Sequence, residues 1–260
     1  MKNRIKHDLM DLMMIPGLSG HEDRVRRDLS GRLSAIGVES RSDRLGNLVA
    51  HFPGDGPRVM LFTHMDQLGF IVRQIEADGL IRLERLGGVP ERALAAQEVL
   101  ICVGEGLDVS GIIANKSHHA TTPSEKNQVV PYAELYVDTG LSSTSEVEAA
   151  GIRIGSPVVY APQALELGDS RICGTSIDDR AGCAVLLEVA RLLKNRTSGP
   201  PVDLAFTVLE EFNLRGALPL AQNLLPDIAI QLDLMLATDT PDMEARGEMV
   251  LGGGPGMSMY

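Results

Sequence analysis

The chain has 260 residues, a formal net charge of −11, 44% apolar residues and only 3% aromatic residues. The acidic balance argues against nucleic acid or an anionic membrane as a partner, because both need a basic face, and the few aromatics disfavour stacking of nucleobases or sugar rings. Its three widely spaced cysteines indicate reduced thiols in a cytoplasmic protein, and no apolar run approaches the length of a membrane span.

The first quarter of the chain carries α/β signals. Apolar residues at helical spacing predict a helix over 4–15, and the capping-box spacing of Ser19 and Glu22 predicts another that ends near residue 35. A hairpin over 38–52 and a short buried strand over 58–62 are expected to follow.

The sequence pattern changes at Gly69. Short strands separated by turn signals follow one another, the first two as a hairpin turned by Asp78-Gly79. One short helix is expected over 145–150. This pattern is typical of a small β-barrel or sandwich, and we therefore predict an inserted β domain over 69–166.

Alternating helices and strands return after Cys173. The predicted elements are a helix over 178–194, a strand over 202–209, a helix over 214–223 and a strand over 227–234. Such alternation favours an α/β fold, in which a mostly parallel sheet carries helices on both faces. The α/β domain would be split, with 1–68 and 167–260 folding together around the insertion.

Acidic residues gather where the apolar runs of this α/β part end or a helix begins. The clusters are His64 with Asp66, Asp178 with Asp179, Glu210 with Glu211, and Asp233 with Asp239. Each has an ordinary explanation alone: Asp178 could be only a helix cap, and Glu210-Glu211 only a solvated loop. Together they would place several negative charges in one cleft, which divalent cations would neutralise. Mixed histidine and carboxylate ligands suit zinc, cobalt or manganese better than calcium or magnesium.

The order and spacing of several motifs resemble the M42 family of metallo-aminopeptidases, some of whose members are called endoglucanases. The motifs are THMDQLGF, SIDDRAG, LEEFNLRGA, QLDLMLATDTPD and GGGPG, with GLSGHEDRVR and NKSHHATTP elsewhere in the chain. The resemblance implies a zinc-peptidase-like fold, a peptide substrate and homo-oligomers, with dimers assembling through the β domain into a larger, dodecameric particle.

The resemblance also implies two divalent metal ions per subunit, zinc or cobalt first and manganese next, and a role for each clustered residue. His64 and Asp233 would bind one metal, Glu211 the other, and Asp178 would bridge them. Glu210 would act as the general base, and Asp66 would orient the His64 ring.

This sequence departs from the family in several places. A further metal-binding histidine is expected near the family's C-terminus, but the last of the six histidines here is His119. The C-terminal part of the α/β domain, which continues in family members, is expected to be missing. Gln67 stands where a Glu is usual, and Asn213 where a Gly is usual.

Two alternatives to an aminopeptidase remain open. A non-catalytic or inactive assembly subunit would explain the absent histidine. A carbohydrate hydrolase of the endoglucanase type is the other alternative, although such enzymes usually offer aromatic side chains for sugar stacking.

Overall fold

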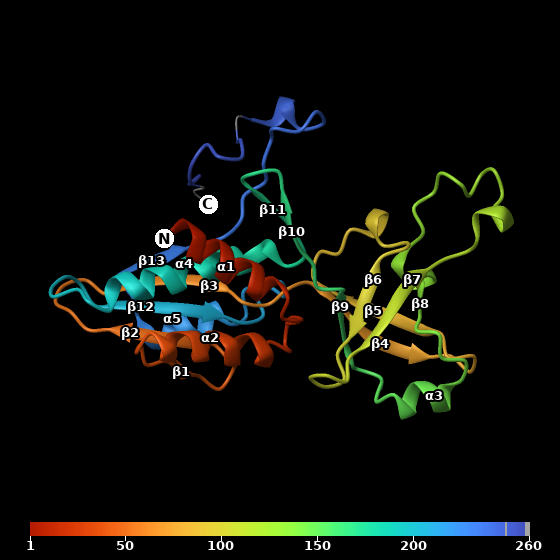
Figure 1. Ribbon diagram of the computed structural model, residues 1–260, viewed down its shortest axis with the longest axis horizontal. Coiled ribbons are helices and arrows are strands. Elements are labelled where there is room, and N and C mark those ends of the chain that lie inside the picture. The colour runs from red at the N-terminus through yellow and green to blue at the C-terminus, as the bar shows by residue number, and fades with distance from the viewer. Residues whose placement is uncertain (248, 258–260) are drawn as a thin grey trace.

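The computed structural model describes residues 1–247 and 249–257, which form two lobes side by side (Figure 1). One lobe is a sheet covered by helices, and the other is a β-barrel. Within these ranges no helix combines the length and the apolarity required to cross a lipid bilayer.

The first lobe is built on a five-stranded sheet in the order β1-β2-β12-β3-β13. The strands are β1 (Arg41–Ser42), β2 (Leu48–Phe52), β3 (Val59–His64), β12 (Val202–Thr207) and β13 (Ile228–Gln231). β12, β3 and β13 are parallel, whereas β2 is antiparallel to both β12 and β1. The α/β class is confirmed, with a mixed sheet whose parallel half carries the acidic clusters.

Helices cover both faces of this sheet, as predicted. They are α1 (Lys2–Met13), α2 (Asp23–Ala35), α4 (Ile177–Leu193) and, on the opposite face, α5 (Ala217–Leu224). The apolar faces of α1, α2 and α4 pack against Leu204 and Phe206 of β12, whereas Leu220 and Leu224 of α5 pack against Ala205. Successive residues of β12 thus point to opposite faces, and all six are buried.

The second lobe is a closed barrel in the order β4-β5-β8-β7-β6-β9. Its strands are β4 (Gly69–Ile75), β5 (Ile81–Leu86), β6 (Glu98–Ile101), β7 (Val109–Ala114), β8 (Tyr136–Asp138) and β9 (Pro157–Tyr160). Phe70, Val72, Ile81, Val137 and Val158 are fully buried or nearly so in its core. Helix α3 (Thr144–Ala149) lies where the sequence predicts it and begins at an N-cap, Ser143.

Several elements differ from the sequence prediction. A hairpin of β10 (Ala164–Leu167) and β11 (Arg171–Gly174), which leads back to the first lobe, was not predicted, and β13 is shorter than the expected strand over 227–234. Ser19 and Glu22 do not form a capping box, because α2 has Glu22 itself as its N-cap. Short 3-10 turns complete the described elements: η1 (Glu91–Ala93), η2 (His118–Ala120), η3 (Tyr132–Glu134) and η4 (Glu244–Arg246).

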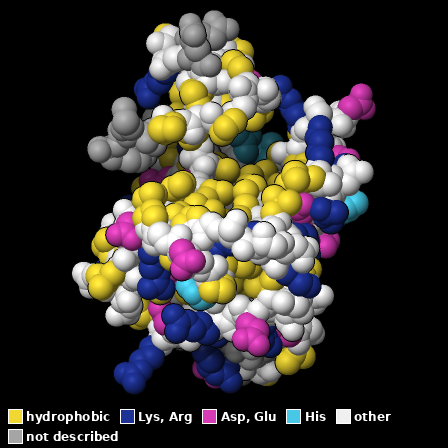
Figure 2. Space-filling view, turned by 90° about the vertical axis from the view of Figure 1, so that its left-hand side faces the viewer, with side chains coloured by type: hydrophobic (Ala, Val, Ile, Leu, Met, Phe, Trp, Pro, Cys, Tyr) yellow, Lys and Arg dark blue, Asp and Glu magenta, His cyan; other side chains and the backbone are white. Residues whose placement is uncertain are grey.

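Strand β13 ends the sheet and is open to solvent. All four of its residues are exposed, including Ile228 and Ile230, at 46% and 49% of their full surface. Figure 2 looks onto the end of the molecule that lies on the left in Figure 1 and shows apolar side chains gathered across its middle, beneath the C-terminal segment. A hollow between that segment and α4 is lined by Val185, Leu232 and Leu251, among others.

Candidate metal centre

Three parallel strands end on the same side of the sheet, and three of the four predicted clusters follow them, whereas Asp178 and Asp179 lie at the start of α4. β3 ends at His64, which is in register with Thr207, the last residue of β12. Glu210 and Glu211 follow β12 after a short turn, and Asp233 follows β13. Because α/β sheets bind ligands at the carboxyl ends of their strands, this edge is the expected place for a site.

His64, Asp178 and Asp233 form a compact group of ligating side chains. One ligand atom from each lies within 4.8 Å of the others, and His64 Nε2 is 3.0 Å from Asp178 Oδ1. The His64 side chain is only 2% exposed, whereas that of Asp178 is 53% exposed. A buried imidazole facing accessible carboxylates is a donor set that fits zinc, cobalt or manganese.

The His64 ring is held so that Nε2 faces the group. Its Nδ1 lies 3.2 Å from the backbone oxygen of Asp66, which can accept the Nδ1 proton and leave the Nε2 lone pair for a metal. Burial works to lower the pKa of His64, but the Asp178 and Asp66 carboxylates outweigh it and raise the pKa to about 11. The surrounding negative charge thus favours a cation at this place.

The side chains of Asp178 and its neighbour Asp179 have different contacts. Asp179 is fully buried, accepts a hydrogen bond from the Thr63 hydroxyl and accepts the Gly182 N–H at 2.9 Å. It therefore has the helix-capping role that the sequence left open for Asp178. Asp178, which has non-helical backbone angles at the start of α4, is left free to face His64.

Glu210 and Glu211 lie beside this group rather than within it. Glu210 Oε2 is 3.8 Å from His64 Nε2. Glu211 lines a cavity together with Asp178. Burial raises the pKa of both carboxyls, that of Glu211 to about 7. The structure thus places the two acids at different points around the centre, and their separate roles stay a prediction.

Asp66 holds the backbone of both acids. Its carboxylate accepts the N–H of Glu210 at 3.0 Å and that of Glu211 at 3.1 Å. Burial alone would raise the pKa of Asp66, but His64 and the Glu210 N–H outweigh it and lower the pKa. Asp66 Oδ1 is also 3.4 Å from His64 Nδ1, so one carboxylate contacts both parts of the site.

Two further side chains bind the backbone just before Glu210, and the sequence analysis assigned neither of them to the site. Asn47 Oδ1 accepts the Val208 N–H at 3.0 Å, and Glu22 Oε1 accepts the Leu209 N–H at 3.1 Å. The consecutive N–H groups of 208–211 therefore all donate to the side chains of Asn47, Glu22 and Asp66. Burial raises the pKa of Glu22 to about 7. No local sequence signal points to these contacts, because their partners are more than a hundred positions apart.

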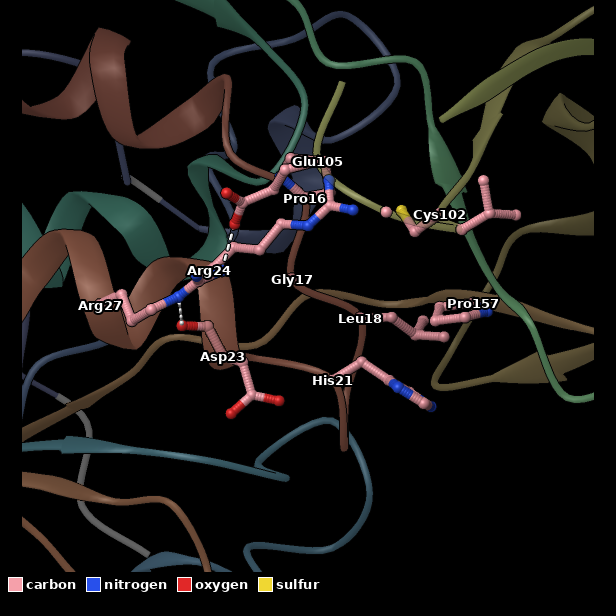
Figure 3. Close-up of a pocket in the computed structure, with 12 residues that line it drawn as sticks. Pro16, Gly17, Leu18, His21, Asp23, Arg24, Arg27, Cys102, Glu105 and Pro157 are labelled. Atoms are coloured by element: carbon pink, nitrogen blue, oxygen red, sulfur yellow. Dashed lines mark hydrogen bonds and ion pairs between the residues drawn. The ribbon is translucent and has the colours of Figure 1, made fainter. Parts of the chain in front are cut away.

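A separate cavity of about 530 Å³ lies at the seam between the lobes (Figure 3). His21 and Arg27 line it from the α/β lobe and Cys102 and Glu105 from the barrel, and none of the predicted site residues lines it. Burial raises the pKa of Cys102 to about 11, so its thiol stays protonated near neutral pH. Arg27 pairs with Glu105 across the seam, which indicates a contact between lobes rather than a reaction site.

Comparisons with known proteins agree with the fold and with the motifs. The lysyl aminopeptidase of Pyrococcus furiosus is 33% identical over 249 residues, which are 94% of this chain and 70% of that protein. The solved aminopeptidase APDkam598 of Desulfurococcus kamchatkensis superposes with a TM-score of 0.85 at 32% identity, over 92% of this chain and 65% of that one. The TET1 peptidase of Pyrococcus horikoshii, described as assembling into a tetrahedron or an octahedral shell, gives 0.81 at 28% identity, over 88% and 68%.

The chain thus spans about two thirds of the length of these relatives. The sequence profile of the M42 glutamyl aminopeptidases matches residues 46–260, which include every residue of the candidate centre except Glu22. The chain belongs to the M42 glutamyl aminopeptidase family.

Proposed function

We propose that this chain acts as a metal-dependent aminopeptidase, which removes N-terminal residues from short peptides. The observation that carries the proposal is the group of His64 and Asp233 at strand ends with Asp178 at the start of α4, and Glu210 at its edge. His64, Asp178, Asp233 and Glu211 would hold two divalent ions, zinc or cobalt first and manganese next. Such ions supply Lewis acidity, which polarises a scissile carbonyl and makes water more acidic.

Glu210 is the residue to which we assign proton transfer. Burial raises its pKa, which brings a carboxyl closer to the pH at which it both accepts and returns a proton. Its backbone N–H is held by Asp66, which limits the positions that its side chain can take. The acidic surroundings would also attract the free ammonium group of a peptide, in keeping with removal of N-terminal residues.

We also propose that the chain assembles through a domain bounded at about 69 and 166, as dimers that build a larger, dodecameric particle. The assembly described for the TET1 peptidase supports this proposal. A cytoplasmic location is proposed from the three cysteines, which are all free.

The direct test measures release of a dye from aminoacyl substrates, with and without a chelator, together with the metal content of the purified chain. We expect chelator-sensitive release and no cleavage of a glycosidic dye. Glu210→Gln should keep the metal and lose at least about 100-fold in kcat. Glu148→Gln, an exposed position on α3, is the matched control.

Three results would contradict this assignment. Loss of metal in Glu210→Gln would mean that Glu210 is a ligand rather than the base. Cleavage of the glycosidic dye alone would favour the carbohydrate hydrolase. Less than one tightly held metal per chain, without peptidase activity, would favour a non-catalytic assembly subunit.

A further inference from the structure

A cavity of about 480 Å³ lies directly beside the candidate metal centre and shares Asp178 and Glu211 with it. Both lobes contribute walls. Pro90, Gln97 and Tyr160 come from the barrel, whereas Thr175 and Ser176 come from the turn that leads into α4. Its size falls within the range of roughly 300–1,000 Å³ that is common for small-ligand pockets.

The lining is neutral apart from the two acids at the centre. Among the described residues that line the cavity, only Asp178 and Glu211 carry a charge. The others are apolar, glycine, or neutral polar side chains such as Gln67, Gln97 and Tyr160. The Tyr160 ring also packs edge-on against Phe70, with ring centroids 6.1 Å apart, which fixes its position.

Arg180 lies behind Gln67 and does not line the cavity. Arg180 is fully buried, and its Nη1 donates to the backbone oxygens of Leu12 and Ile15 at 2.8 and 3.1 Å. Its Nη2 donates to Gln67 Oε1 at 3.4 Å, and this oxygen also accepts the Gly17 N–H. Gln67 therefore stands between Arg180 and the cavity, and an acidic substrate side chain would find no free cation there.

We propose that this cavity receives the side chain of the substrate's N-terminal residue and selects uncharged side chains such as those of leucine and methionine. The inference rests on the proposed aminopeptidase function, in which Asp178 and Glu211 are occupied with metal ions. A glutamyl side chain would then lose its hydration without gaining a cation. A lysyl side chain would likewise lack a free carboxylate.

Gln97 is the position that tests the charge of the pocket. Its side chain lines the cavity, and the hydrogen bonds found for this residue involve only its backbone. A new charge at this position should therefore change the preference for charged substrates while leaving the fold intact. Gln128, an exposed residue of the barrel that lines a different hollow, offers the same substitution outside this cavity.

The experiment compares kcat/KM for leucyl, methionyl, glutamyl and lysyl p-nitroanilides, using the metal-loaded chain. Calorimetric binding of L-leucinamide, L-lysinamide and the α-amide of L-glutamic acid is measured in parallel. We expect leucyl and methionyl substrates to exceed both charged substrates by about 100-fold. Gln97→Lys should favour the glutamyl substrate by about 10-fold over wild type, Gln97→Glu should favour the lysyl substrate similarly, and Gln128→Lys should change neither.

The outcomes separate this inference from the proposed function. A preference for the glutamyl or lysyl substrate, or an equal effect of Gln97→Lys and Gln128→Lys on substrate preference, would contradict the proposed selection of uncharged side chains. The proposed aminopeptidase function would not be affected by either result. Absence of hydrolysis with the expected order of amide binding would reject the enzyme activity but keep the pocket. If leucinamide binds no better than the charged amides and nothing is hydrolysed, both are rejected.

Discussion

The carboxylate of Asp66 accepts the backbone N–H of Glu210 at 3.0 Å, and so joins the end of β3 to the turn that follows β12. We predict that Asp66→Ala lowers kcat by about 10- to 100-fold, as is usual when a residue that supports a metal site is removed. Asp66→Asn should recover part of this loss, because its amide oxygen can still accept one N–H.

The measurement must distinguish a role of Asp66 in positioning the site residues from an effect of the substitution on folding. KM should change less than kcat, and the melting temperature of Asp66→Asn should stay near that of the wild type. Equal losses in Asp66→Asn and Asp66→Ala would show that the charge on Asp66, rather than its hydrogen bonds, matters for turnover.

Glu22 provides the corresponding contact at Leu209, a residue with a left-handed backbone at φ 57°. Glu22 Oε1 also accepts the Gly20 N–H at 2.7 Å. Glu22→Ala would leave these N–H groups without their partner, and we expect a loss of about 1–3 kcal/mol in the free energy of unfolding. Glu22→Gln keeps an accepting oxygen and should restore most of it.

Urea denaturation of both Glu22 variants, together with kcat, is the appropriate measurement. If Glu22→Ala unfolds like the wild type and turns over equally fast, the contact with Leu209 has no role in holding the turn.

Local sequence patterns were sufficient to predict most of the helices, strands and turns of the fold. The Asp78-Gly79 turn was predictable because the backbone there requires a residue such as Gly79, with φ at 84°. Asn213 likewise adopts φ 69°, as its tolerance of left-handed backbone allows.

The site was predictable only as a set of residue types at strand ends. His64 and Asp233 came together because parallel strands end at one edge, which alternating elements already indicate, and Asp178 joins them from the start of α4. The supports of the 208–211 turn were not predictable, because Glu22 and Asn47 lie 187 and 161 positions from the residues that they hold. Such contacts depend on tertiary packing, and the local spacing of Ser19 and Glu22 suggested a different role.

The ion pair of Arg24 and Asp108 joins the two lobes, and we predict that it contributes to their association. Its nitrogen–oxygen distances are 2.5 and 2.8 Å, and the two side chains are only 18% and 13% exposed. For a bidentate and largely buried ion pair we expect a coupling energy of about 1–3 kcal/mol. A double-mutant cycle with Arg24→Met and Asp108→Asn, followed by thermal unfolding, measures it.

The pair of Lys116 and Glu125 is the control for this cycle. These side chains are 54% and 44% exposed, so solvent screens their attraction and their coupling should be much weaker than that of Arg24 and Asp108. Equal coupling in the two cycles would mean that the seam between the lobes is not stabilised by Arg24 and Asp108.

Asp203 links pH to stability at the end of the sheet away from the metal centre. Its side chain is fully buried, and its oxygens lie 2.8 Å from His51 Nδ1 and 2.6 Å from Arg58 Nε. Burial alone would raise the pKa of Asp203, but Arg58 and His51 outweigh it and hold the pKa below its usual range. The folded state therefore binds the proton less readily than the unfolded state, and the resulting stabilisation is complete above the unfolded pKa.

We predict that Asp203→Asn lowers the free energy of unfolding by about 2 kcal/mol at pH 7, because a hydrogen-bonded charge is removed while its partly exposed partners can regain water. The difference from the wild type should shrink as the pH falls from about 5 through the pKa of folded Asp203. Urea denaturation from pH 7 to pH 3 measures this. Asp55→Asn, at an exposed acid of the same lobe, should show no such trend; a difference for Asp203→Asn that does not shrink between about pH 5 and pH 3 would contradict the assigned ion pair with Arg58.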